Sequence, residues 1–170
     1  MLITEEYRNL NKKLHQSRPD YGTSSKKWVD LVRDICNKAN SVDILDYGCG
    51  KSLLKNGLGD AYDVSEYDPA VPGKDSIPEP HDIVVCTDVM EHIEPELLDN
   101  VLDDLKRVTR KVLFMTVATR PAVKTLEDGR NAHLIQKDFD WWKPKIEERF
   151  RIVGSQEFTG NEFILFLIPK

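Results

Sequence analysis

A short glycine turn is the first feature of this sequence that could do chemistry. Residues 44–53 read ILDYGCGKSL, so that Asp46 stands two positions before Gly48 and Gly50 follows at the next alternate position. Glycines in such a turn let the backbone approach a ligand closely and place N–H groups at the start of the next helix. The plain alternative is a turn that only joins a strand to a helix, with Asp46 as a cap.

Two common ligands of glycine turns fit this one poorly. Gly50-Lys51-Ser52 suggests a phosphate loop, but the full motif needs a glycine five positions before Gly50, where the sequence has Leu45. The dinucleotide pattern GxGxxG needs a small third residue for close helix packing, and that position is Leu53. An acidic D-x-G-x-G pattern remains.

With the apolar residues before it, this pattern resembles motif I of the class I methyltransferases that use S-adenosylmethionine (SAM). SAM has no phosphate but carries an ammonium and a sulfonium, so a carboxylate at a strand tip is favourable where it would repel pyrophosphate. The resemblance implies that SAM is bound by the turn residues Asp46, Tyr47, Gly48, Cys49 and Gly50.

A second carboxylate follows at the spacing expected for a ribose contact. Asp68 lies between Tyr67 and Pro69, about 20 residues beyond the glycine turn, at the end of a weak apolar segment. Its two oxygens can accept hydrogen bonds from a ribose diol, and Tyr67 or the peptide after Asp68 could flank the adenine. By resemblance, Asp75 or Ser76 in the stretch 74–80 would contact the adenine amino group.

The stretch 86–95, CTDVMEHIEP, resembles the motif IV region of small methyltransferases. The resemblance places Thr87 and Asp88 near the methionine part of SAM and the transferable methyl. Glu91 and His92 then have two interpretations. They orient the acceptor or take its proton, or they only brace the loop.

The loop after the apolar segment 111–117 is expected to help form the acceptor pocket. His133 is the best candidate for a general base, although a histidine hydrogen-bonded within the loop is an equal interpretation. Arg120 and Arg130 could grip a carboxylate or phosphate, or lie solvated at the surface. Asn131 is a further candidate for the acceptor.

Trp141 and Trp142 cannot both face one side of a helix. One of the two is expected in the core, and the other at the pocket or an interface. We take Trp142 as the candidate that contacts the acceptor.

The elements that must position these residues alternate along the chain. Helices are predicted at 4–15, from an N-cap at Thr23 or Ser24, at 95–108 and at 138–150; strands are predicted at 42–47, 63–67, 82–87, 111–117, 151–159 and 162–169. Near-continuous apolar strands separated by helices indicate a parallel sheet covered on both faces. Gly160-Asn161 predicts a closing hairpin. The fold class is therefore α/β. By resemblance it is a Rossmann-like, mostly parallel seven-stranded sheet with helices on both faces and a C-terminal antiparallel hairpin.

Composition sets further limits. The chain has 170 residues and a formal net charge of −5 without a basic run, which disfavours generic nucleic-acid binding. Cys36, Cys49 and Cys86 are far apart, so reduced thiols are expected, and without a CxxC or HxxxH pattern no metal site is expected. The longest apolar run, 163–168, is too short for a bilayer, and acids stand where a signal peptide would be basic, so the expected location is the cytoplasm with no membrane contact.

We therefore expect one domain over 1–170, with an arm or lid at 1–22 and a core at 23–170. Tyr21 and Gly22 could close over the cofactor. The resemblance implies methyl transfer from SAM to an oxygen or nitrogen nucleophile on a small or polymer-borne polar acceptor, such as a sugar, nucleotide or natural-product group. The alternative is a non-catalytic module that binds SAM or its demethylated product as a sensor or partner subunit. A nicotinamide-dependent reductase is disfavoured by Leu53 and Asp46.

Overall fold

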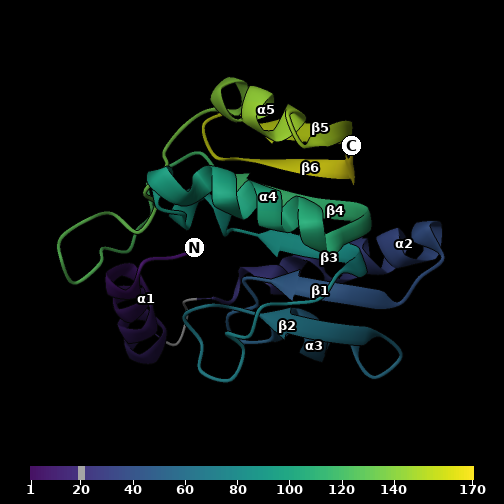
Figure 1. Cartoon of the computed structure of the whole chain (residues 1–170), viewed down its shortest axis with the longest axis horizontal. Helices are drawn as coiled ribbons and strands as arrows, with labels where there is room; N and C mark the ends of the chain where they lie inside the picture. Colours follow the sequence, from purple (N-terminus) through teal and green to yellow (C-terminus); the bar gives the residue numbers. More distant parts are fainter. Residues whose placement is uncertain (19–21) are drawn as a thin grey trace.

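Six strands form one sheet in the computed structural model, which describes residues 1–18 and 22–170 (Figure 1). The strands are β1 (Asp43–Tyr47), β2 (Asp63–Tyr67), β3 (His81–Thr87), β4 (Thr109–Ala118), β5 (Phe150–Phe158) and β6 (Glu162–Pro169). They lie in the order β2-β1-β3-β4-β6-β5. β1 to β4 run parallel, and β6 runs antiparallel to both β4 and β5. The predicted α/β class and hairpin are confirmed.

Helices cover both faces of this sheet. They are α1 (Glu5–Ser17), α2 (Val29–Ala39), α3 (Leu53–Leu58), α4 (Leu98–Val108) and α5 (Phe139–Glu147), with 3-10 turns at Ser24–Trp28, Met90–His92 and Pro95–Leu97. α2 and α3 pack on one face, whereas α4 and α5 pack on the other. None of the helices built from the described residues has the length and apolar character needed to cross a bilayer.

Alternating side chains along the strands divide the core into two layers. In β1, Leu45 packs with α4 and α5, whereas its neighbour Ile44 packs with α2 and α3. In β3, Val84 and Val85 divide in the same way. The alternation follows from the two-residue period of a strand, and both faces are apolar because helices cover both.

The predicted number of seven strands is wrong for the part of the chain that the structure describes. The connection between β2 and β3, residues 68–80, contains turns and bends but neither a helix nor a strand. Its prolines cannot donate to a ladder, and a single crossover between parallel strands already takes a dozen or more residues. β2 is therefore an edge strand of the sheet.

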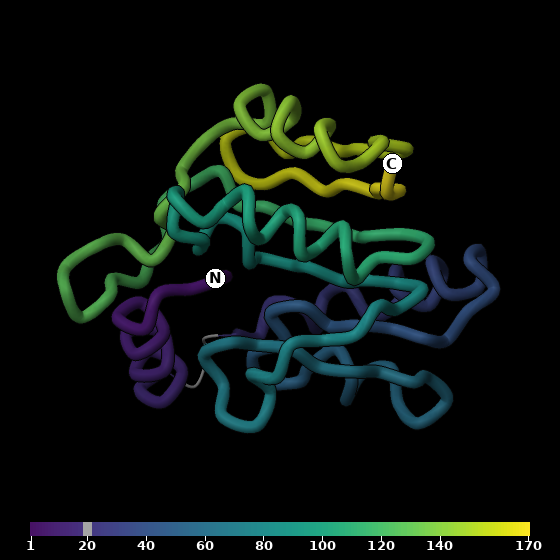
Figure 2. Tube along the Cα trace, viewed as in Figure 1, coloured from purple at the N-terminus to yellow at the C-terminus, as the bar shows by residue number. Residues whose placement is uncertain are grey.

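α1 and the loop at 119–138 lie together beyond the carboxyl ends of the parallel strands (Figure 2). Tyr7 and Leu14 of α1 form a third apolar cluster with Leu126 and Ala132 of that loop. α1 is the described part of the predicted arm; Tyr21, which we expected to close over a cofactor, lies outside the described residues. Both segments are thus held at the edge where open α/β sheets bind ligands.

Candidate functional site

A cavity of about 460 Å³ opens at this carboxyl edge. This volume lies in the range typical of small-molecule sites. Many of the predicted site residues line it: Gly22, Gly48, Gly50, Asp68, Pro69, Asp88, Glu91, His92, Arg120 and His133. The topology brings these residues together because β1, β2, β3 and β4 all end at the same edge.

The glycine turn forms one part of the cavity wall. Its backbone N–H groups already donate hydrogen bonds to other groups of the protein. The amides of Gly48 and Cys49 both donate to the carbonyl oxygen of Tyr67, at 2.7 and 3.1 Å. The amide of Gly50 donates to Oδ2 of Asp68 at 3.1 Å. A phosphate at this turn would have to displace these acceptors, so the turn is not built as an anion site.

Packing explains why this turn needs glycine. Gly48 and Gly50 have φ values of +81° and +48°, which L side chains rarely adopt. A Cβ on Gly48 would collide with Val89, and one on Gly50 would lie 2.8 Å from Cα of Gly22. The amide of Lys51 also donates to the carbonyl of Gly22 at 3.1 Å. The end of the N-terminal segment therefore rests directly on the turn.

Asp46 lies beneath the turn. Its side chain is buried, and Oδ2 has no hydrogen-bond partner among the described residues. Burial, reinforced by the charge of Glu66, raises the pKa of Asp46 to about 7, although Lys74 opposes the rise. A carboxylate in this position is stabilised by a nearby positive charge.

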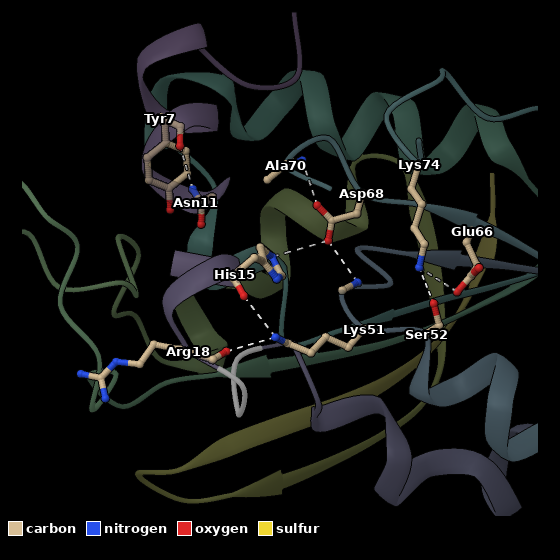
Figure 3. Close-up of polar contacts among 11 residues, drawn as sticks. Tyr7, Asn11, His15, Arg18, Lys51, Ser52, Glu66, Asp68, Ala70 and Lys74 are labelled. Atoms are coloured by element: carbon tan, nitrogen blue, oxygen red, sulfur yellow. Dashed lines mark hydrogen bonds and ion pairs between the residues drawn. The ribbon is translucent and has the colours of Figure 1, made fainter. Parts of the chain in front are cut away.

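Asp68 faces the cavity from the end of β2 and is held in place by backbone donors (Figure 3). Besides Gly50, the amide of Ala70 donates to its Oδ1 at 2.9 Å. Nε2 of His15, from α1, lies 3.9 Å from Oδ2. Each oxygen of a carboxylate has more than one lone pair, so Asp68 can still accept bonds from a ligand.

Lysines connect the turn to its surroundings (Figure 3). Nζ of Lys51 donates to the carbonyls of His15 and Arg18 at the end of α1, at 3.1 Å each. Nζ of Lys74 contacts Oγ of Ser52 and lies 3.3 Å from Oε1 of Glu66. The C-terminal end of α1 is thus attached to the glycine turn itself.

Another part of the cavity lining, here called the histidine wall, carries Glu91, His92 and His133. The imidazole rings of the two histidines lie 4.8 Å apart, edge to face. Burial, followed by the charge of His133, lowers the pKa of His92 to about 4, and burial also lowers the pKa of His133. Burial and then the charge of Asp88 raise the pKa of Glu91 well above its usual value. Both rings are therefore neutral near pH 7.

Backbone carbonyls orient both rings. Nδ1 of His92 lies 2.7 Å from the carbonyl oxygen of Ala132, and Nδ1 of His133 lies 2.7 Å from that of Arg120. Oδ1 of Asn131 accepts hydrogen bonds from the amides of Ala122 and His133 at 2.9 Å each. Asn131, which we predicted to contact the acceptor, therefore braces the loop that carries His133 and is not part of the cavity wall.

Trp142 is a correction to our acceptor residues. It is fully buried in the core with α4 and the sheet, because the helical turn of α5 directs it inward and leaves Trp141 half-buried. Arg130 also lies off the cavity wall; it is exposed and pairs with Asp128 at 2.7 Å. Arg120 does line the cavity, and its Nε donates to Oδ1 of Asn161 at 2.8 Å.

Several predicted cofactor residues lie behind the wall. Tyr47 and Tyr67 pack against each other in the core on the α4 side, with ring centroids 4.9 Å apart and the ring planes tilted by 58°. Cys49 and Thr87 are buried, whereas Ser76 is exposed on the connection after β2. Of these, Tyr67 shapes the site through the carbonyl that accepts the turn amides. The three cysteines are free buried thiols, as expected.

The sequence interpretation predicted an N-terminal arm or lid but missed which residues of α1 reach the cavity. Tyr7, Asn11 and His15 line the cavity from this helix. Their spacing of four residues puts them on one face of a helix, and that spacing is the signal that could have identified them. The hydroxyl of Tyr7 donates to the carbonyl of His92 at 2.6 Å, which ties α1 to the histidine wall.

These features define a Rossmann-like α/β domain with a polar cavity at the carboxyl edge of its parallel strands. Its fold is that of solved methyltransferases. The 1,6-didemethyltoxoflavin-N1-methyltransferase of Burkholderia thailandensis, solved with 1,6-didemethyltoxoflavin and S-adenosylhomocysteine, aligns with a TM-score of 0.71 and 11% identity over 100% of this chain and 92% of its own. A SAM-dependent methyltransferase of Clostridium acetobutylicum ATCC 824 aligns with a TM-score of 0.67 and 12% identity over 96% of this chain and 98% of its own.

Magnesium protoporphyrin IX methyltransferase of Synechocystis PCC 6803, solved with bound S-adenosylhomocysteine, is a third similar structure. It has a TM-score of 0.59 and 17% identity, over 85% of this chain and 83% of its own. No protein-family model matches the sequence, and no curated protein matches it. At these identities the likeness establishes the fold.

Proposed function

We propose that the protein is a methyltransferase that uses SAM. The observation that carries the proposal is the glycine turn between Asp46 and Asp68. Its N–H groups are taken by protein acceptors, while a carboxylate stands beneath it and another beside it. Such a turn suits a ligand that is cationic at one end and a nucleoside at the other, and it disfavours a phosphate.

The residues present fit SAM. Asp68 would hold the ribose hydroxyls, since it faces the cavity and is fixed by two amides. Asp46 does not line the cavity, but from beneath the turn its charge would compensate the ammonium, because its buried oxygen has no partner among the described residues. Asp88, at the end of β3, lines the cavity between this region and the histidine wall. When bound, SAM supplies an electrophilic methyl on a sulfonium.

The acceptor would lie against the wall of Glu91, His92 and His133. These groups are polar, Glu91 and His133 are buried and His92 is half-buried, and all three line the same cavity as Asp68. α1 lines that cavity through Tyr7, Asn11 and His15 and would restrict the access of water to it. The cavity volume suits a small polar acceptor or one group of a larger one, with an oxygen or nitrogen nucleophile. The similar structure from Burkholderia, which holds a small heterocycle, supports a small acceptor.

The two competing functions make different predictions. A nicotinamide-dependent reductase would need free N–H groups for a pyrophosphate, and the amides of Gly48, Cys49 and Gly50 are engaged by the protein. A sensor that only binds SAM would need no polar wall beyond the methyl. The buried carboxylate and two imidazoles on that wall favour the enzyme.

Calorimetric titration tests the proposal. SAM and S-adenosylhomocysteine are expected to bind, whereas NADH and ATP are not. Asp68→Asn is expected to weaken SAM binding by roughly 1–3 kcal/mol, the scale for charge-assisted hydrogen bonds. Asp60→Asn, in the exposed loop between α3 and β2 at the opposite edge of the sheet, is the matched control and should bind normally.

Unchanged SAM affinity in a folded Asp68→Asn variant would contradict the ribose assignment. Binding of NADH or ATP in preference to SAM would overturn the function as a whole. If SAM binds, product formation with a library of hydroxyl and amine acceptors separates the enzyme from the sensor.

A further inference from the structure

Glu91, His92 and His133 present three ligand atoms of the kind that bind metal ions. These atoms all lie within 4.8 Å of one another. Glu91 and His92 come from the turn after β3, and His133 comes from the loop after β4, so two separate segments converge on one point. From the sequence we expected no metal site, because the third ligand lies far along the chain and no CxxC or HxxxH pattern connects the three.

Both imidazoles are oriented in the manner of metal ligands. A ring nitrogen that faces a carbonyl oxygen must carry the hydrogen, and in a neutral ring the other nitrogen then has the lone pair. Nδ1 of His92 faces the carbonyl of Ala132 and Nδ1 of His133 faces that of Arg120, at 2.7 Å each. The lone pair is thus on Nε2 in both rings. Metal-binding histidines are fixed by outer hydrogen bonds of this kind.

The carboxylate of Glu91 points to a missing positive charge. The side chain is fully buried, and its Oε1 accepts a hydrogen bond from the amide of Ala118 at 3.0 Å. Oε2 is buried without a hydrogen-bond partner among the described residues. A buried carboxylate without a counter-charge or further donors is costly. Asp88 also lines the cavity and adds negative charge nearby, and the charge of Arg120 offsets only part of it, since the pKa of Glu91 stays raised.

We propose that Glu91, His92 and His133 bind a divalent transition-metal ion at the wall of the cavity. Two imidazoles and one carboxylate suit Mn²⁺, Fe²⁺, Co²⁺ or Zn²⁺ better than the all-oxygen preference of Ca²⁺ or Mg²⁺. Ligand atoms about 2.1 Å from one tetrahedral ion lie about 3.4 Å from one another. Ligand atoms up to 4.8 Å apart therefore each move by less than about 1 Å to close around an ion.

Three protein ligands leave coordination positions for an oxygen in the cavity. If the protein is the proposed methyltransferase, the acceptor would carry a hydroxyl group whose oxygen binds the ion at such a position. This part of the inference rests on the proposed function. The ion would lower the pH at which such a hydroxyl loses its proton to solvent water, because a cation stabilises an oxygen anion. The two histidines would then position the ion, and neither would act as the general base that we expected from the sequence.

Cobalt binding to the full chain, freed of any affinity tag and treated with a chelator, tests the site. Co²⁺ is expected to bind at one site and to give visible absorption bands characteristic of nitrogen and oxygen ligands. Glu91→Gln and His133→Gln are each expected to weaken binding by more than about tenfold. His81→Gln is the matched control, because His81 begins β3 at the opposite edge of the sheet and pairs with Asp43.

Glu91→Gln keeps the shape of the side chain and the acceptor for the amide of Ala118, so it separates ion binding from folding. Absence of saturable Co²⁺, Mn²⁺ or Zn²⁺ binding by the unmodified chain would overturn the proposal, as would equal binding by all three variants. SAM calorimetry on the same samples distinguishes the two proposals. SAM binding without metal binding refutes only the metal site, and metal binding without SAM binding refutes only the methyltransferase.

Discussion

Three acidic side chains around the cavity differ in how the protein compensates their charge. Asp68 accepts hydrogen bonds from two backbone amides, of Gly50 and Ala70. Asp46 and Glu91 each keep one buried oxygen that no described residue satisfies. Buried polar groups without partners are rare in native proteins and are often found where a ligand or ion completes them. The same two side chains are those to which we assign cationic partners.

Asp46 gives the protein a pH-dependent stability of a defined sign. Its pKa of about 7 in the folded chain lies above the reference value of 3.8. The contribution of the protonated Asp46 side chain to the free energy of unfolding is therefore fully present below about pH 4. It is lost as the pH rises to about 7, where the carboxyl group ionises in the folded chain. Relative to Asp46→Asn, the unfolding free energy of the unmodified chain should fall by about 1.4 kcal/mol per pH unit in this window.

Denaturant unfolding from pH 4 to pH 8 measures this difference without ligand. Comparing the two chains cancels the other titrating groups. Curves for the two chains that stay parallel over the whole range would show that Asp46 ionises normally.

At the scale of residues, the sequence predicted the site residues at the glycine turn and the strand end better than those whose place depends on the direction of a side chain. Gly48, Gly50 and Asp68 line the cavity because the strand-to-helix turn and strand spacing determine their positions. Trp142 went to the core because one position along a helix changes its direction by about 100°, and the apolar pattern does not decide which of two tryptophans faces inward. Ser76 is exposed because its segment forms no strand.

At the scale of elements, the N-terminal segment and the glycine turn depend on each other. Gly50→Ala would place a Cβ 2.8 Å from Cα of Gly22, in addition to straining a φ of +48°. Gly73→Ala, with a φ of +83° and no atom within 4 Å of the new Cβ, carries the strain alone and is the matched control. Gly73→Ala should lower the free energy of unfolding by about 1–2 kcal/mol. Gly50→Ala should lower it by more and should also weaken SAM binding.

Denaturant unfolding and calorimetry on both variants measure these effects. Equal losses of stability in the two variants would mean that the backbone at Gly22 moves away from the new Cβ without cost and does not pack on the turn.

The start of α1 is a second attachment of that helix. Oγ1 of Thr4 accepts a hydrogen bond from the amide of Tyr7 at 3.2 Å and donates to Oε1 of Glu94 at 2.6 Å. Thr4→Ala removes this cap, so we expect a loss of about 1–2 kcal/mol in the local stability of α1. Hydrogen exchange in α1 should then be about tenfold faster or more, as measured by mass spectrometry.

Lys13→Ala is the control for this change. Lys13 and Glu127 form an ion pair between exposed side chains, at 2.5 Å. Such pairs contribute about 0–1 kcal/mol, so exchange in α1 should hardly change. Faster exchange in Lys13→Ala than in Thr4→Ala would show that the surface pair, and not the cap, holds the helix.

Most elements were predictable from the sequence, and the exceptions have physical causes. β2 and β6 have the predicted bounds, since turn residues flank their apolar runs. The seventh strand came only from the family resemblance, and the prolines in residues 68–80 oppose it. The packing of α1 on the 119–138 loop could not be predicted, because it joins segments more than 100 residues apart whose apolar positions are sparse.

At the scale of the whole molecule, one sheet connects both core layers, so we expect them to unfold together. Trp28 reports on the layer with α2 and α3, whereas Trp141 and Trp142 report on the layer with α4 and α5. Trp28→Phe and the double variant Trp141→Phe/Trp142→Phe therefore each leave fluorescence from one layer. Within each variant, the fluorescence and circular dichroism midpoints should coincide. Separate midpoints would show that one layer unfolds first.

The position of β6 in the sheet limits the order in which parts of the cavity can fold during translation. β6 is synthesised after the other five strands, yet it lies inside the sheet, between β4 and β5. The turn before it supplies Asn161, whose carbonyl accepts from the amide of Thr119 and whose side chain holds Arg120. Arg120 in turn orients His133. A nascent chain that has not yet released this hairpin from the ribosome therefore lacks the contacts by which Asn161 holds Arg120, whose carbonyl orients His133.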